Sequence, residues 1–122
     1  MVVVRVCEGY VDSAVFYVAD LGDKSMISWS HDGSVTDFAA WPLAGDREWR
    51  LARPLPAWKA GWGYAVYGAT HDNRWSGTRV ECTPGDLGAL RPGQVRYQPF
   101  AADSPKTTSL ASFQEHACDS AH

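Results

Sequence analysis

Turn-forming residues recur about every ten positions along this 122-residue chain, and they separate short apolar runs. The turn segments are DLGD, HDGS, PLAGD, RPLP, HDNR, TPGD and RPGQ, and each supplies a glycine, proline, aspartate or asparagine suited to a tight turn. Apolar runs this short are typical of strands rather than helices. We expect strands at residues 2–7, 14–19, 24–30, 34–40, 47–52, 62–69, 75–82 and 94–100. The pattern predicts an all-β fold, a single-domain antiparallel β-sandwich or barrel of about eight short strands.

The composition changes beyond Phe100, where alanine and serine are the commonest residues and aspartate, proline and threonine also occur. We therefore divide the chain into an antiparallel β domain over residues 1–101 and a C-terminal tail over 102–122. Within the tail, Leu110, Phe113 and Ala117 recur at helical spacing, so the tail is either mobile or a short amphipathic helix.

The charge distribution argues against two classes of partner. The net charge is −3 and the basic residues form no stripe, so the electrostatic attraction that drives nucleic-acid binding is missing. No apolar run approaches the ~20 residues of a membrane span. Arg5 interrupts the apolar N-terminus, so we expect no secretory signal.

The three cysteines, Cys7, Cys82 and Cys118, are widely spaced and contain no C-x-x-C pair. Without a signal sequence they predict reduced thiols in a cytoplasmic protein, with Cys7 and Cys82 as small buried residues. Arginine outnumbers lysine by eight to three, which is typical of a GC-rich bacterial genome.

The first candidate site is a sheet face. If Asp72 and Asn73 form a two-residue hairpin turn, Tyr64 lies opposite Glu81. One face of the hairpin then carries aromatic surface and an opposed ion pair, which suits a ligand groove. Its substrate-binding candidates are Trp62, Tyr64, Trp75, Arg79 and Glu81. The alternative is that the aromatic residues are core and that Arg79 and Glu81 form a weak ion pair at the sheet edge.

Two His-Asp pairs at expected hairpin turns form the second candidate site. A neutral imidazole is the usual general base near pH 7, and a neighbouring carboxylate can orient it. The catalytic candidates are His31, His71 and Asp72. The alternative is that both pairs are turn chemistry with solvated histidines, since neighbouring residues on a strand point to opposite faces.

Two further groups of residues carry weaker signals. Arg47 and Arg53 share a strand parity with Trp49, so they could clasp an anion, although a charged edge strand gives the same pattern. His116, Cys118 and His122 match no zinc-ligand spacing, so we expect no metal. The chain has no phosphate-binding or dinucleotide-binding loop motif, and we expect no cofactor.

These observations favour a small cofactor-free tailoring enzyme that binds a peptide or another natural product. It would catalyse cyclisation, conjugate addition or isomerisation by acid/base chemistry. A carbohydrate-binding module is the first alternative, because six tryptophans offer surfaces for sugar rings. An interaction or immunity-type protein is the second. A homodimer is expected because open sheet edges need cover.

Overall fold

The computed structural model describes residues 2–7, 9–21, 25–55, 59, 61–72, 79–98 and 104–118. The strands are β1 (Val2–Arg5), β2 (Val11–Val18), β3 (Ile27–Val35), β4 (Phe38–Trp41), β5 (Arg50–Leu51), β6 (Tyr64–Ala69), β7 (Val80–Cys82), β8 (Gln94–Tyr97) and β9 (Lys106–Ser109). The helices are α1 (Pro84–Gly88) and α2 (Leu110–His116). Each of the eight expected strands overlaps an observed one, and the all-β antiparallel fold is confirmed. No helix in these residues has the length and apolarity needed to cross a membrane.

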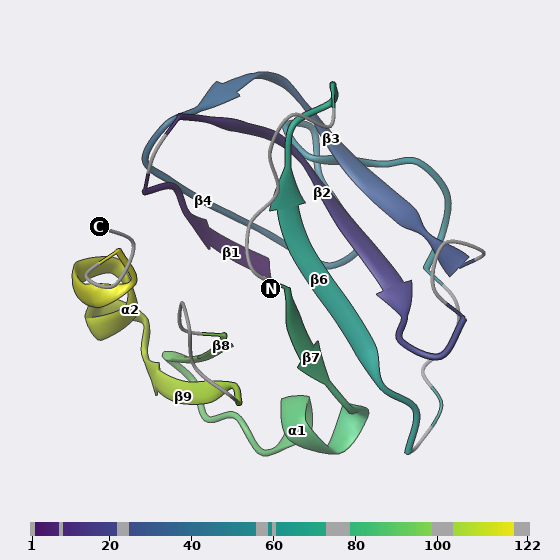
Figure 1. Ribbon diagram of the computed structural model, residues 1–122, viewed down its shortest axis with the longest axis vertical. Coiled ribbons are helices and arrows are strands. Elements are labelled where there is room, and N and C mark those ends of the chain that lie inside the picture. Colours follow the sequence, from purple (N-terminus) through teal and green to yellow (C-terminus); the bar gives the residue numbers. More distant parts are fainter. Residues whose placement is uncertain are drawn as a thin grey trace.

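A five-stranded antiparallel sheet in the order β5-β3-β2-β6-β7 forms the centre of the fold (Figure 1). Its middle strand, β2, pairs with β3 on one side and with β6 on the other. Ala14, Phe16 and Val18 are buried, whereas Val15 and Tyr17 between them are partly exposed. This alternation sets which face of the sheet packs on the core.

The core lies between that face and a second, two-stranded sheet of β1 and β4. Three buried tryptophans fill it. The rings of Trp41 and Trp49 stack with centroids 3.8 Å apart, and Trp29 meets Trp41 edge-on at 5.9 Å. A Cβ atom at Gly68 would lie 3.5 Å from a Val4 methyl, so β1 packs closely over β6. Most of the tryptophan content of the described chain therefore serves packing rather than a binding surface.

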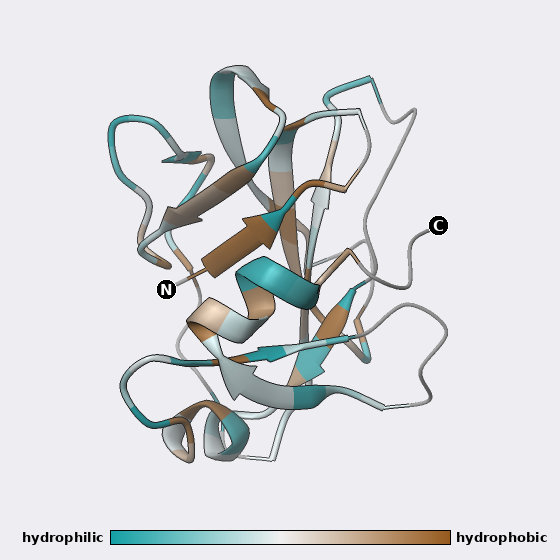
Figure 2. Cartoon of the chain, turned by 90° about the vertical axis from the view of Figure 1, so that its left-hand side faces the viewer, coloured by the Kyte–Doolittle hydropathy of each residue, from teal (hydrophilic) through white to brown (hydrophobic). Residues whose placement is uncertain are grey.

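The C-terminal segment is ordered as a β8–β9 pair followed by α2, which lies beside that pair in both views (Figures 1 and 2). The Ser109 hydroxyl accepts the amide N–H of Ser112 and caps the helix. Phe113 is buried against Tyr97, with ring centroids 5.3 Å apart. The short amphipathic helix expected from the Leu110 and Phe113 spacing is confirmed. Strand β9 was not expected, because its sequence KTTS has no apolar alternation and it forms by pairing with β8.

The prediction of three reduced thiols is wrong for two of them. Cys7 and Cys118 form a disulfide, which joins the end of the β1 segment to the residues after α2. Cys82 is free and buried, as expected. Spacing alone could not reveal the pair, because only the folded chain brings residues 111 positions apart into contact.

The expected register of the β6–β7 hairpin is also wrong. Tyr64 lies opposite Cys82, and Ala65 rather than Tyr64 lies opposite Glu81. A shift of one residue moves every side chain of a strand to the other face. The observed pairing is one residue away from the pairing that a two-residue turn at Asp72 and Asn73 would give.

The placement of the first His-Asp pair at a hairpin turn is wrong as well. His31 and Asp32 lie within β3, which continues to Val35, and the turn to β4 follows at residues 36–37. The strand extends because Val35 pairs with Val11 at the start of β2. The second pair, His71 and Asp72, does lie in a turn directly after β6.

Candidate functional site

The residues proposed for catalysis and for binding lie at opposite ends of the central sheet. His31 and His71 lie near the start of β2, and Trp62 and Tyr64 lie near its end at Val18. Seven residue steps along a strand span roughly 20 Å. Two separate sites therefore need description, here called the histidine end and the apolar pocket.

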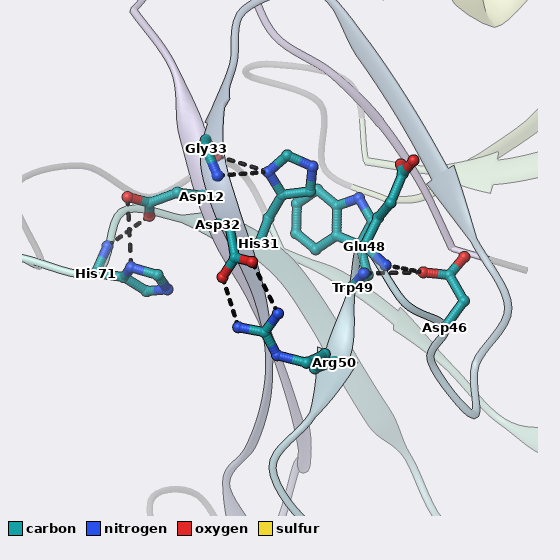
Figure 3. A network of polar contacts seen from close by, with 9 residues as sticks. All are labelled: Asp12, His31, Asp32, Gly33, Asp46, Glu48, Trp49, Arg50 and His71. Carbon is teal, nitrogen blue, oxygen red and sulfur yellow. Dashed lines mark hydrogen bonds and ion pairs between the residues drawn. The ribbon is translucent and has the colours of Figure 1, made fainter.

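The histidine end is built around an irregularity in the pairing of β2 with β3. The register shifts between Val11 and Ser13, so that several residues of β3 oppose Asp12 alone. Bulges of this kind re-aim side chains and are common beside functional sites. Here the bulge turns the His31 ring toward Trp49, with ring centroids 4.9 Å apart (Figure 3). Nδ1 of His31 lies 2.6 Å from the carbonyl oxygen and 3.1 Å from the amide nitrogen of Gly33.

Asp32 faces away from His31 and pairs with Arg50 on β5 (Figure 3). The two guanidinium nitrogens donate to the two carboxylate oxygens at 3.0 and 2.6 Å, which is the bidentate geometry that suits this pair. The hydrogen bond from Arg50, together with its charge, holds the pKa of Asp32 below its ordinary value. Asp32 is thus committed to an ion pair and does not orient the neighbouring imidazole.

The His71 ring lies close to the carboxylate of a residue on β2, Asp12. Oδ1 of Asp12 accepts the backbone N–H of His71 at 2.7 Å, and Oδ2 lies 3.5 Å from Nδ1 of the His71 ring. Asp72, the expected partner, accepts a hydrogen bond from the Thr70 hydroxyl instead. The structure therefore supplies the His-carboxylate contact that the sequence suggested, but with Asp12, which carried no sequence signal.

The histidine end is open to solvent and offers no metal site in the residues described. The His71 side chain is about half exposed, at 52%. No group of three or more metal-ligating side chains occurs in the part of the chain that the structure covers. The arrangement can support proton transfer at an exposed imidazole.

The apolar pocket lies where β2 ends and where β3 and β6 begin. Its volume of about 370 Å³ is within the range of small-molecule sites. Tyr64 is buried and stacks on Phe16, with ring centroids 5.4 Å apart, so this wall belongs to the rigid core. The apolar and aromatic lining consists of Val18, Leu21, Ile27, Pro54, Trp62 and Tyr64.

The polar lining of the pocket consists of Ser25, Arg53 and Lys59. The Ser25 hydroxyl accepts the backbone N–H of Val18 at 2.8 Å. The Lys59 ammonium lies 4.4 Å from the centre of the Trp62 ring, in cation–π contact. Arg53 donates to the carbonyl oxygen of Met26 at 2.8 Å. The sequence singled out Trp62, Tyr64 and Arg53, but no spacing pattern marked Leu21 or Lys59.

The remaining candidate residues do not join either site. Arg79 donates to the hydroxyl of Tyr17 at 3.1 Å and lies 3.5 Å from Glu81. Both belong to the face that carries Tyr17, away from Tyr64, as the observed register requires. Trp75 lies outside the described residues.

The anion clasp around Trp49, one of the two interpretations of this segment, does not form, because Trp49 is only 2% exposed. Strand β5 lies at the edge of the central sheet, in line with the other interpretation, a charged edge strand. Arg53 lies at the apolar pocket instead, and Arg47 is exposed.

Comparison with protein-family models, with curated proteins and with solved structures finds no match to this chain.

Proposed function

We propose that this domain is a binding protein for a small molecule whose body is aromatic or aliphatic, and that the apolar pocket is its site. The observation that carries the proposal is the position of two exposed side chains. Leu21 and Trp62 are 49% and 40% exposed, and both line this pocket. Large apolar side chains that gather in solvent at one cavity are typical of ligand sites.

The rigidity of the walls supports the same proposal. The Tyr64 hydroxyl accepts the backbone N–H of Lys59 at 2.9 Å, and Ser25 is tied to the backbone of Val18. These contacts tie Ser25 to the end of β2 and Lys59 to the start of β6. A preformed site loses little conformational entropy on binding, which favours affinity.

The test uses two probes with the same body, 4-phenylbutan-1-ol and 4-phenylbutyrate. We expect at least one of them to bind saturably and to shift the amide signals of Val18, Leu21 and Trp62 in ¹H–¹⁵N NMR spectra. Trp62→Ala should abolish the response. Tyr10→Ala is the matched control, because Tyr10 is also an exposed aromatic residue but lies at the other end of β2. If neither probe binds, or if the two variants bind the probes equally well, the proposed binding function is refuted.

A second candidate function is acid/base catalysis at His71, the tailoring chemistry of cyclisation, conjugate addition or isomerisation. The contact between Asp12 and His71 favours it, because a carboxylate beside an imidazole can orient the ring for proton transfer. Hydrolysis of p-nitrophenyl acetate is a simple assay of such an imidazole. We expect His71→Gln and Asp12→Asn both to lower the rate, while His116→Gln, an exposed histidine elsewhere, leaves it unchanged. Equal rates in all the variants would remove this candidate.

We also propose that the domain works in an oxidising compartment rather than in the cytoplasm that its cysteine spacing suggested. The Cys7–Cys118 disulfide supports this, since such bonds persist mainly outside the reducing cytosol. Alkylation of intact cells with a maleimide under denaturing lysis, followed by mass spectrometry, tests it. Modification of Cys82 alone is the expected result, and modification of all three cysteines would restore the cytoplasmic location.

A further inference from the structure

We infer that the ligand of the apolar pocket is an anion, a carboxylate attached to an aryl or medium-length alkyl body. The inference rests on the proposed function, because it names the chemical class that the same pocket selects. It is drawn from the charges at the pocket and from how each cation is held.

The charge at the pocket is opposite in sign to that of the whole chain. The protein has 14 acidic and 11 strongly basic residues. Of the described residues that line the pocket, two are cationic, Arg53 and Lys59, and none is acidic. In a chain of net negative charge, two cations beside an otherwise apolar cavity form a local match to an anion rather than part of a general basic surface.

Lys59 is held at the pocket by contacts that leave its ammonium group able to bind a ligand. Its backbone N–H is held by the Tyr64 hydroxyl, and its ammonium lies over the exposed Trp62 ring. The aromatic ring attracts the ammonium, but it does not form the strong hydrogen bonds with the three N–H groups that a carboxylate forms. A ligand whose body packs on Trp62 thus brings its head group next to this ammonium.

Arg53 differs from the arginines that form ion pairs within the fold. Arg5, Arg50, Arg79 and Arg96 each pair with a carboxylate. Arg53 donates through Nη2 to a backbone carbonyl and makes no ion pair with any residue that the structure describes. A guanidinium has five N–H donors, so one such bond fixes the group and leaves donors for a ligand carboxylate.

The apolar lining of the pocket further limits the chemical class of the ligand. Val18, Leu21 and Ile27 offer no polar atoms of their side chains, so the body of the ligand must be apolar to gain from burial there. A compact, highly charged ion such as inorganic phosphate would leave this apolar surface uncovered. A carboxylate with an apolar body satisfies both parts of the pocket.

The experiment compares 4-phenylbutyrate with 4-phenylbutan-1-ol by calorimetric or NMR titration at pH 7. Charge-assisted contacts to two cations predict that the carboxylate binds about tenfold more tightly than the alcohol. The preference should shrink as salt is added, because the head group lies near solvent. In Arg53→Gln/Lys59→Gln we expect the carboxylate to lose its advantage, so that the two probes bind equally. Lys106→Gln, an exposed cation on β9, is the matched control and should keep the preference.

Each outcome distinguishes the inference from the proposed function. If both probes bind wild-type protein equally, or if the preference survives in the double variant, the anion inference is overturned and the binding function stands. If neither probe binds saturably, the binding function fails and the inference with it. Lys59→Gln alone provides a second route if the Arg53 substitution disturbs folding, because the Lys59 side chain is exposed. It should lose part of the preference.

Discussion

Cys7 and Cys118 are joined by a disulfide across 111 residues, with their Cα atoms 5.3 Å apart. The bond fastens the segment after α2 to the segment after β1. Arg5, two residues before Cys7, donates from Nε to the backbone carbonyl of Gln114 at 3.2 Å and so joins the end of β1 to α2. The first and last parts of the described chain thus form one unit, and the C-terminal helix is part of the folded domain.

This bond predicts a large dependence of stability on redox conditions. A cross-link that closes a loop of about 100 residues stabilises a fold by roughly 4–5 kcal/mol in the chain-entropy model. We expect dithiothreitol to lower the free energy of unfolding by that order, and Cys7→Ser/Cys118→Ser to lower it similarly without further response to the reductant. Urea titrations followed by tryptophan fluorescence measure both. Cys82→Ala serves as the control and should respond to the reductant like the wild type; equal stability of oxidised and reduced protein would contradict the prediction.

The pair of Arg50 and Asp32 predicts a stability change on the acid side. Because the folded state holds the pKa of Asp32 below its value in the unfolded chain, the pair stabilises the fold above the ordinary carboxyl range. That contribution is lost as the pH falls through the lowered pKa. Arg50→Gln should raise the pKa of Asp32 toward its ordinary value, as measured by carboxyl ¹³C NMR. Arg79→Gln, which removes a distant arginine, should leave it unchanged, and an unchanged Asp32 titration in Arg50→Gln would refute the assignment.

We expect the same substitution at two buried tryptophans, Trp29 and Trp41, to lower the stability of the fold by different amounts. Nε1 of Trp29 donates to the carbonyl oxygen of Leu43 at 3.0 Å, whereas Nε1 of Trp41 has no hydrogen-bond partner in the residues that the structure describes. Tryptophan to phenylalanine removes similar volume at both positions. Only Trp29→Phe leaves a carbonyl group unpaired, so it should be the more destabilising by about 1–3 kcal/mol. Denaturant titration of the two variants decides this, and equal costs would count against it.

The turn before β5 predicts a strong requirement for glycine at one position. Gly45 has φ of +82°, and a Cβ atom there would lie 2.8 Å from the backbone carbonyl oxygen of Trp49. Gly93 has a similar φ of +83°, but an added Cβ would meet nothing within 4 Å. We expect Gly93→Ala to cost about 1–2 kcal/mol through its backbone conformation alone. Gly45→Ala should cost clearly more, because the overlap adds to the strain, and thermal unfolding of both variants provides the comparison.

Local sequence patterns were sufficient for eight of the nine strands in the described residues and for the C-terminal helix. Turn residues at regular intervals located all eight expected strands, and the spacing of Leu110 and Phe113 located α2 with Phe113 buried. These features depend on residues that are close in sequence, because alternation along a strand and spacing along a helix determine which side chains share a face. Strand β9 was missed for the same reason, since its polar sequence becomes a strand only when β8 lies beside it.

The candidate sites depended on information that is not local. The sequence alone determined an antiparallel β fold with a helix near its end, and it marked His71, Trp62 and Tyr64 as residues of interest. Only the tertiary structure decided that Asp12 rather than Asp72 meets His71, and that Trp62 joins Leu21, Arg53 and Lys59 at a pocket. The physical reason is that strand register, the bulge beside Asp12 and the Cys7–Cys118 contact are set by how distant segments pack together. A shift of one residue in that packing exchanges the two faces of a strand, so the faces follow from the fold as a whole.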